Sequence, residues 1–195
     1  MGTVPNPRLW AAGEIPTAAH FNADIKDAQN FFKTPPTGIV RNTTNVPDVV
    51  TNTWTVLTWN TDVIDTDAIH DTGSNTSRLV AKTAGYYYVF ARIRWEWHID
   101  NDGMRGIWIK KNANGSVANG TTVANDFRHS NNWSSTPNNR HGCGCTGFTG
   151  LLAVNDYLEC FVWHDQDNLI GSDNSEIWHS DTTTQVRFGM YWVSD

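Results

Sequence analysis

The stretch AGYYYVFARIRWEWHI, residues 84–99, constrains the fold more than any other part of this chain. Every odd position from Tyr87 to Ile99 is apolar, whereas the even positions change from aromatic at Tyr86 to charged at Glu96. Because successive side chains of a β-strand point to opposite faces, this alternation predicts one core face and one face that passes from a covered region to solvent or to a neighbouring subunit. A ligand platform is the alternative interpretation of the aromatic residues, but alternation of this length usually reflects packing.

Shorter runs with the same period of two recur after Pro36. Asn-Gly pairs at 114–115 and 119–120 supply turn signals between them. The predicted strands cover residues 37–42, 53–60, 77–83, 104–112, 148–155, 156–165 and 182–194. We therefore predict a mainly β fold, an antiparallel jelly-roll sandwich of two packed sheets. Residues 126–144 lack the alternation and are predicted to form an exposed excursion.

Residues 1–36 have a different pattern, so we predict two parts: an N-terminal arm and helix (1–36) and a jelly-roll head domain (37–195). Thr17 is a predicted helix N-cap, and the residues after it place an apolar stripe at Phe21, Ile25, Ala28 and Phe32. An extended arm precedes this single amphipathic helix. A helix of this length is marginal alone, so its stripe needs a partner surface.

The formal net charge of -6, with Lys and Arg scattered, argues against a nucleic-acid partner. No run of 18 apolar residues occurs and the N-terminus lacks a signal-peptide core, so we expect neither membrane spanning nor signal-directed export. Three cysteines leave an odd thiol under any pairing, which favours reduced, partly buried thiols.

Two clusters are weak candidates for metal binding. Asp65 and Asp67 lie in DVIDTDAIHD, whose oxygen-rich side chains could hold calcium, although its spacing favours turn and hydrogen-bond chemistry. His141, Cys143 and Cys145 would share one face of an extended strand, and a zinc or iron site there would need a further ligand, which threefold symmetry could supply. Small buried thiols beside glycines are the favoured interpretation. We predict no metal and no cofactor.

Motifs that indicate catalysis are absent from the sequence: it contains no Gly-rich phosphate loop, no G-x-S-x-G elbow and no H-E-x-x-H. We therefore expect a protein that is not an enzyme and has no catalytic residue.

The order of several short motifs resembles the jelly-roll family of the complement first-component globular head and tumour necrosis factor. The segments that carry the resemblance are AKTAGYYYVFARIRW, RGIWIKKNANG, CTGFTGLLAVNDYLECFVW and TQVRFGMYWV. The positions that match the family pattern are Gly85, Tyr86, Lys111, Asn112, Leu152, Asp156, Phe188 and Gly189. The last strand departs from this pattern: the usual Phe-Ser-Gly is Arg187-Phe188-Gly189 here, and the final residues are Trp192 and Val193.

The N-terminal part resembles virion structural proteins of tailed bacteriophages that infect actinobacteria, described as minor tail, head-fibre or decoration proteins. The resemblance rests on PRLWAAGEIPTAAHFNADIKDAQNFF and on the segment from NTWTVLTWN to RLVAKTAG. It implies a homotrimeric head at the virion surface, made in the host bacterial cytoplasm and anchored to capsid or tail subunits. The anchoring residues would be Trp10, Ile15, Phe21, Ile25, Phe31 and Phe32. The alternative is a tail- or fibre-associated head that recognises host surface carbohydrate, with Trp133 stacking on the sugar.

Overall fold

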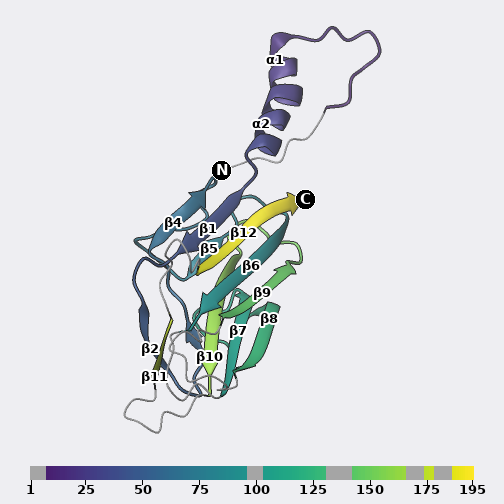
Figure 1. The fold of residues 1–195 in the computed structure, drawn as a ribbon. Helices are drawn as coiled ribbons and strands as arrows, with labels where there is room; N and C mark the ends of the chain where they lie inside the picture. The colour runs from purple at the N-terminus through teal and green to yellow at the C-terminus, as the bar shows by residue number, and fades with distance from the viewer. Residues whose placement is uncertain (1–7, 96–102, 131–141, 166–173, 178–185) are drawn as a thin grey trace.

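The computed structural model describes residues 8–95, 103–130, 142–165, 174–177 and 186–195. These residues form a sandwich of two antiparallel sheets with a helix projecting from one end (Figure 1). Sheet I has the strand order β4-β1-β12-β6-β9, and sheet II has the order β3-β10-β7-β8, with β5 also pairing with β10. A separate two-stranded sheet joins β11 and β2. The predicted jelly-roll sandwich is confirmed.

The elements have the following bounds: α1 Ala18–Phe21, α2 Asp27–Lys33, β1 Thr37–Arg41, β2 Val46–Val50, β3 Thr55–Val56, β4 Thr61–Asp65, β5 Arg78–Val80, β6 Tyr86–Arg94, β7 Gly103–Lys111, β8 Thr121–Ser130, β9 Gly142–Phe148, β10 Tyr157–His164, β11 Asn174–Ile177 and β12 Arg187–Ser194.

Strand β6 lies near the middle of sheet I, between β12 and β9, and its alternation is the predicted one. The side chains of Tyr87, Val89, Ala91, Ile93 and Trp95 are all buried in the core between the sheets. The intervening side chains lie on the outer face of sheet I, where they are exposed or half-buried. Such burial of every second residue is the main reason why this stretch is a strand.

The positions that resemble the complement and tumour necrosis factor family hold the loops at one end of the sandwich together. Lys111 forms an ion pair of 2.7 Å with Asp156. The side chain of Asn112 donates to Asp156 at 2.7 Å and accepts the backbone N–H of Tyr157 at 3.0 Å. Gly85 and Leu152 exchange backbone hydrogen bonds of 3.0 and 2.9 Å. These residues therefore connect turns that are far apart in the sequence.

Some strand predictions are wrong. The predicted strands do not include β2, β4, β8 or β11, and the predicted excursion at 126–144 contains the end of β8 and the start of β9. Residues 149–155, predicted as a strand, form a loop with one isolated bridge at Leu152. The missed strands lie at sheet edges or in the small sheet, where only one neighbour pairs and no strict apolar alternation is needed.

The predicted helix begins as expected, since the Thr17 hydroxyl accepts the backbone N–H of His20 at 3.3 Å. It is not a regular α-helix, because a π-helical turn at Asn22–Lys26 separates α1 from α2. There the N–H of Asp27 donates to the carbonyl of Asn22, five residues back. This wider turn rotates α2 relative to the stripe that a regular helix would have formed.

Gly85 should tolerate no side chain. Its φ is +149°, and a Cβ there would lie 2.2 Å from Nε1 of Trp192 and 2.5 Å from the carbonyl of Ser194. We expect Gly85→Ala to lower the free energy of unfolding by about 3 kcal/mol or more, measured by chemical denaturation. Gly150→Ala is the control: a Cβ at Gly150 would meet nothing within 4 Å, so a change beyond about 0.5 kcal/mol there would contradict the explanation.

Candidate functional site

The most exposed apolar side chains lie on the N-terminal arm and helix. The helix points away from the sandwich, and residues 8–17 form a loop beside it (Figure 1). Ile15 is 82% exposed and Phe32 69% exposed. Trp10, Phe21 and Ile25 are each close to half exposed. Five of the six predicted anchoring residues are therefore free of the head domain.

Phe31 is the exception among the predicted anchoring residues, because it is buried and not exposed. Its ring is 8% exposed and packs edge-on against the indole of Trp192, with 4.9 Å between ring centroids. Phe31 thus fixes the helix to strand β12.

The arm makes contacts with its own helix. The indole of Trp10 lies edge-on to the ring of His20, with centroids 5.5 Å apart. Arg8 forms an ion pair with Glu14 and lies over the Trp10 ring, 4.8 Å from its centroid. The Glu14 carboxylate also accepts the N–H of Ala11 at 3.1 Å. These contacts hold the loop beside the helix while leaving its apolar side chains accessible.

A second exposed surface is the aromatic patch on the outer face of sheet I, formed by Tyr86, Tyr88, Phe148 and Tyr191. The Tyr88 ring lies 5.0 Å from that of Tyr191 and 5.2 Å from that of Phe148. Phe148 is 65% exposed. The patch occupies the half of the sheet nearer to the helix, because Tyr191 pairs with Thr37, the first residue of the strand that follows the helix. A large exposed aromatic patch of this kind is typical of a contact surface.

The acidic cluster forms a hydrogen-bonded turn. The carboxylate of Asp65 accepts the backbone N–H groups of Asp67, Ile69 and His70 at 3.2, 2.9 and 3.0 Å. Asp67 accepts the hydroxyl of Thr83 at 2.8 Å. Both carboxylates are thus engaged with the protein. Within the ranges that the structure describes, no group of three or more His, Cys, Asp or Glu side chains is placed to hold a metal ion.

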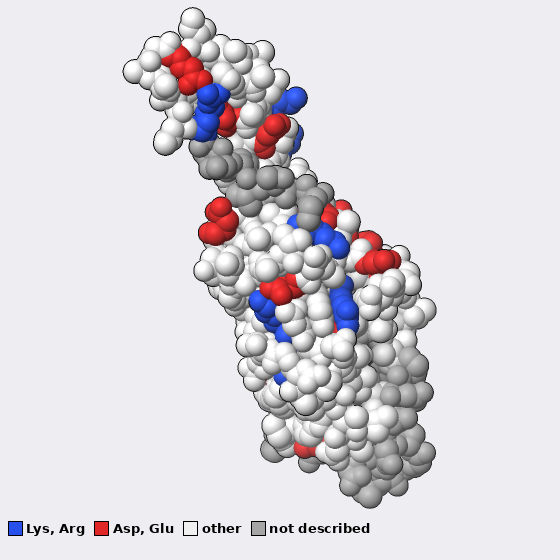
Figure 2. All heavy atoms as spheres, turned by 180° about the vertical axis from the view of Figure 1, so that it is seen from behind, with Lys and Arg blue, Asp and Glu red and all other residues white. Residues whose placement is uncertain are grey.

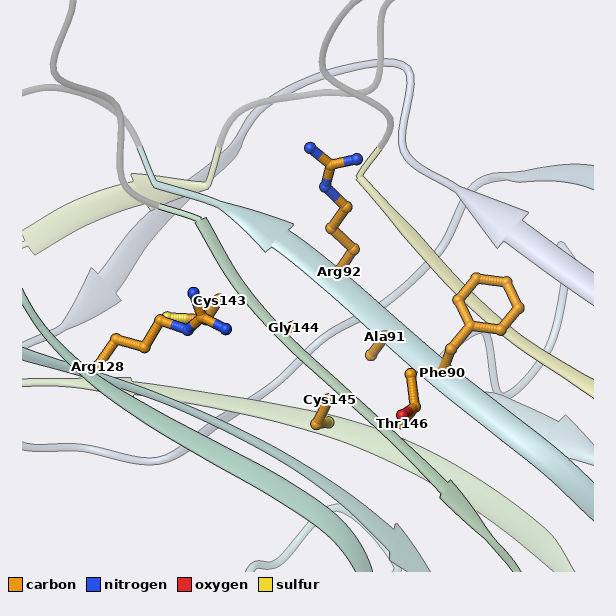
Figure 3. Close-up of a pocket in the computed structure, with 8 residues that line it drawn as sticks. All are labelled: Phe90, Ala91, Arg92, Arg128, Cys143, Gly144, Cys145 and Thr146. Carbon is orange, nitrogen blue, oxygen red and sulfur yellow. The ribbon is translucent and has the colours of Figure 1, made fainter.

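Cys143 and Cys145 point inward from edge strand β9, and neither is part of a disulfide. Figure 3 shows both thiols on one side of the strands, with Arg128, while Arg92 lies on the other side. Burial raises the pKa of Cys143 to about 11 and that of Cys145 to about 12. Burial also raises the pKa of Cys160 well above its usual value. His141, the third member of the predicted metal cluster, is outside the described residues.

An aromatic cluster that was not predicted from the sequence lies on the outer face of sheet II. The indole of Trp54 lies 4.5 Å from that of Trp108 and 6.2 Å from that of Trp163, and Phe127 packs edge-on against Trp54 at 5.9 Å. All four side chains are partly exposed. Their residues lie on four strands or loops, so only the strand register could reveal the cluster. Trp133, the predicted glycan contact, is outside the described residues.

Charges of both signs are mixed over the described residues on the face opposite to the view of Figure 1 (Figure 2). No extended patch of one sign is visible on that face. In the part of the chain that the structure covers, no helix is both long and apolar enough to cross a membrane.

The sandwich is similar to crystal structures of murine APRIL. One at pH 5.0 aligns with a TM-score of 0.55 and 11% identity, covering 80% of this chain and 98% of that chain. Others at pH 8.0 and pH 8.5 align with TM-scores of 0.54 and 0.51, each with 10% identity and the same coverage. No family model and no curated protein matches the sequence. The chain therefore has a tumour-necrosis-factor-like jelly-roll fold, as the motifs of the head domain indicated.

The contact between Phe31 and Trp192 should stabilise the docked helix. We expect Phe31→Ala to cost about 1.5–3 kcal/mol, the value of burying one large apolar side chain, and to increase amide hydrogen exchange in α2 more than in β6. Phe32→Ala is the matched control, because the neighbouring ring is mostly exposed and its loss should cost less than about 0.5 kcal/mol. Equal effects of the two variants would contradict the docking.

The buried thiols should remain protonated well above neutral pH. We expect slow reaction of all three with a disulfide reagent at pH 8 in the folded protein and fast reaction after unfolding. The contribution of the thiols to stability should be constant below pH 9 and fall above it, by up to about 1.4 kcal/mol per pH unit per thiol, because unfolded thiols ionise near 9.0 while Cys143 and Cys145 resist ionisation until about 11 and 12. Cys145→Ala should flatten this decline. Rapid reaction of the native thiols at pH 8 would contradict the assignment.

Proposed function

We propose that this chain is a non-enzymatic structural protein of a tailed-phage virion, a capsid decoration protein with a homotrimeric head anchored by its N-terminal arm. The observation that carries the proposal is the exposed apolar surface of a helix that projects from a well-packed head. The N-terminal resemblance to actinobacteriophage virion proteins supports it. The protein would be made in the host bacterial cytoplasm and would act at the virion surface.

Anchoring would come from burial of the exposed side chains in a groove of a capsid or tail subunit. Each large apolar side chain that becomes fully buried contributes about 1.5–3 kcal/mol, before the entropy lost on association is subtracted. Among the predicted anchoring residues, Ile15 and Phe32 have the largest exposed fractions, followed by Phe21, Ile25 and Trp10. Three arms on one trimer would bind with avidity, since the first contact raises the effective concentration of the others.

The aromatic patch of sheet I would supply the trimer contact. Its rings are already arranged by contacts with one another, so little side-chain entropy would be lost on association. Aromatic residues are enriched in the buried centres of protein interfaces. The even positions of β6 would then have the subunit-facing role that their pattern suggested.

A second candidate function, adhesion to host surface carbohydrate, is favoured by the aromatic cluster of Trp54, Trp108, Phe127 and Trp163. Partly exposed indole rings provide flat apolar surfaces on which sugar rings stack. In this case the head would be associated with a tail or fibre. The cluster lies on the opposite sheet from the proposed trimer surface, so the two roles do not compete for the same residues.

Binding to purified capsids that lack the protein tests the proposal. We expect the full chain to co-sediment with them, and deletion of residues 1–36 to abolish binding while the head retains its trimeric mass in solution. The triple variant Phe21→Ser, Ile25→Ser, Phe32→Ser, which leaves the Phe31 contact intact, should weaken binding at least tenfold. Lys33→Gln is the control on the same helix and should bind normally.

Other outcomes separate the alternatives. Capsid binding that survives loss of the arm would refute the anchoring role. Retention on host cells through residues 37–195 alone, lost on Trp54→Ala, would favour carbohydrate adhesion instead. A monomeric mass for the full chain at micromolar concentration would refute the trimer.

A further inference from the structure

The outer face of sheet I carries an unusual row of positive charge at the end remote from the helix. Arg187 on β12 is directly opposite Arg92 on β6. Val40 on β1 pairs with Phe188 on β12, so the next residue of β1, Arg41, lies opposite Arg187. Because Val40, Phe188 and Ala91 point into the core, the adjoining arginines point outward. We call Arg41, Arg187 and Arg92 the arginine row.

No ion pair compensates the row within the described part of the chain; the carboxylate of Asp126, which accepts the backbone N–H of Gly144 at 3.5 Å, is paired with Arg128. Arg41, Arg92 and Arg187 form none of the ion pairs found there, in contrast to Arg78 with Glu159 and Arg128 with Asp126. The Nε atoms of Arg41 and Arg187 are buried and have no hydrogen-bond partner. The residues that end the row are Thr61 on β4 and Gly144 on β9, neither of which is acidic.

Such a row is unfavourable in isolation. Neighbouring strands lie about 4.8 Å apart, and like charges directly opposite each other on a sheet are destabilising. Guanidinium groups present forks of N–H donors that match the oxygens of phosphate and carboxylate groups. An anion placed over the row would therefore reduce the repulsion between the guanidinium groups.

Space for an anion is available beside Arg92. Gly144, the residue opposite Arg92 on the edge strand, has no side chain to cover it. A cavity of about 430 Å³ opens here, lined by Arg92, Gly144 and Thr146 among others, with Arg128 at its far side (Figure 3). The hydroxyl of Thr146 adds a neutral hydrogen-bonding group on the exposed surface.

We propose that the arginine row binds a small oxyanion of the phosphate class that carries at least two negative charges. One monovalent anion would leave most of the charge of three arginines uncompensated, whereas a diphosphate can bridge neighbouring guanidinium groups. The site is formed by one chain and goes beyond the proposed role in a virion, so the two inferences can fail separately.

Thermal unfolding of the full chain in low-salt buffer, with and without inorganic pyrophosphate, tests the site. We expect pyrophosphate at about a hundred times its dissociation constant to raise the Tm of the natural protein by roughly 5–10 °C. For the double variant Arg92→Gln, Arg187→Gln the shift should be below about 1 °C. Without pyrophosphate, the double variant should have a Tm about 1–3 °C higher than the natural protein, because repulsion is relieved.

Lys33→Gln removes a positive charge from the helix and serves as the matched control, which should respond to pyrophosphate as the natural protein does. The proposal is overturned if sodium chloride at equal ionic strength gives the same shift, since that would be screening alone. It is equally overturned if the arginine variants have a lower Tm without pyrophosphate, or if they lose oligomeric mass while binding pyrophosphate normally. In the last case an acidic surface of a second copy would be the true partner.

Discussion

The arrangement of the molecule depends on the contacts of one residue, Trp192. Its backbone N–H donates to the carbonyl of Pro36 at 2.8 Å, and its Nε1 donates to the carbonyl of Ala84 at 3.1 Å. Its ring receives Phe31 from the helix, and Gly85 leaves the space that the ring occupies. This one residue of the last strand therefore contacts the segment between α2 and β1, the turn before β6 and the helix. These contacts fix the direction of the helix relative to the sandwich, and Trp192 is also part of the core.

The two sheets divide their faces between packing and contact. The inward faces form one continuous core, from Val40 and Phe188 in sheet I to Ile107 and Leu158 in sheet II. The outward faces of both sheets carry clustered aromatic side chains that are exposed or partly exposed. The proposals for trimer contact and for carbohydrate adhesion rest on these outer residues, whereas the proposed anchoring rests on the helix and arm.

The sequence was most informative where one residue pattern had one physical cause. The alternation of β6 follows from its central position, and Thr17 caps the helix as expected because its hydroxyl satisfies a free N–H. Edge strands such as β4 and β8 need only one buried face or none, so their composition did not identify them. The π-helical turn before α2 has no recognisable signature in the sequence of Asn22–Lys26. The arginine row and the cluster around Trp54 unite residues from different strands, and only the register brings them together.

On the outer face of sheet I, the half nearer to the helix carries the aromatic patch and the remote half carries the arginine row. These two halves respond differently to temperature and to salt. Apolar association weakens on cooling, whereas repulsion between exposed arginines is reduced by dissolved ions. Any assembly that uses the whole of this face would consequently be loosest in cold, dilute solution and firmest in warm, concentrated electrolyte. The stability of a particle joined through this sheet would therefore depend on both the temperature and the salt concentration of the medium in which it is assembled.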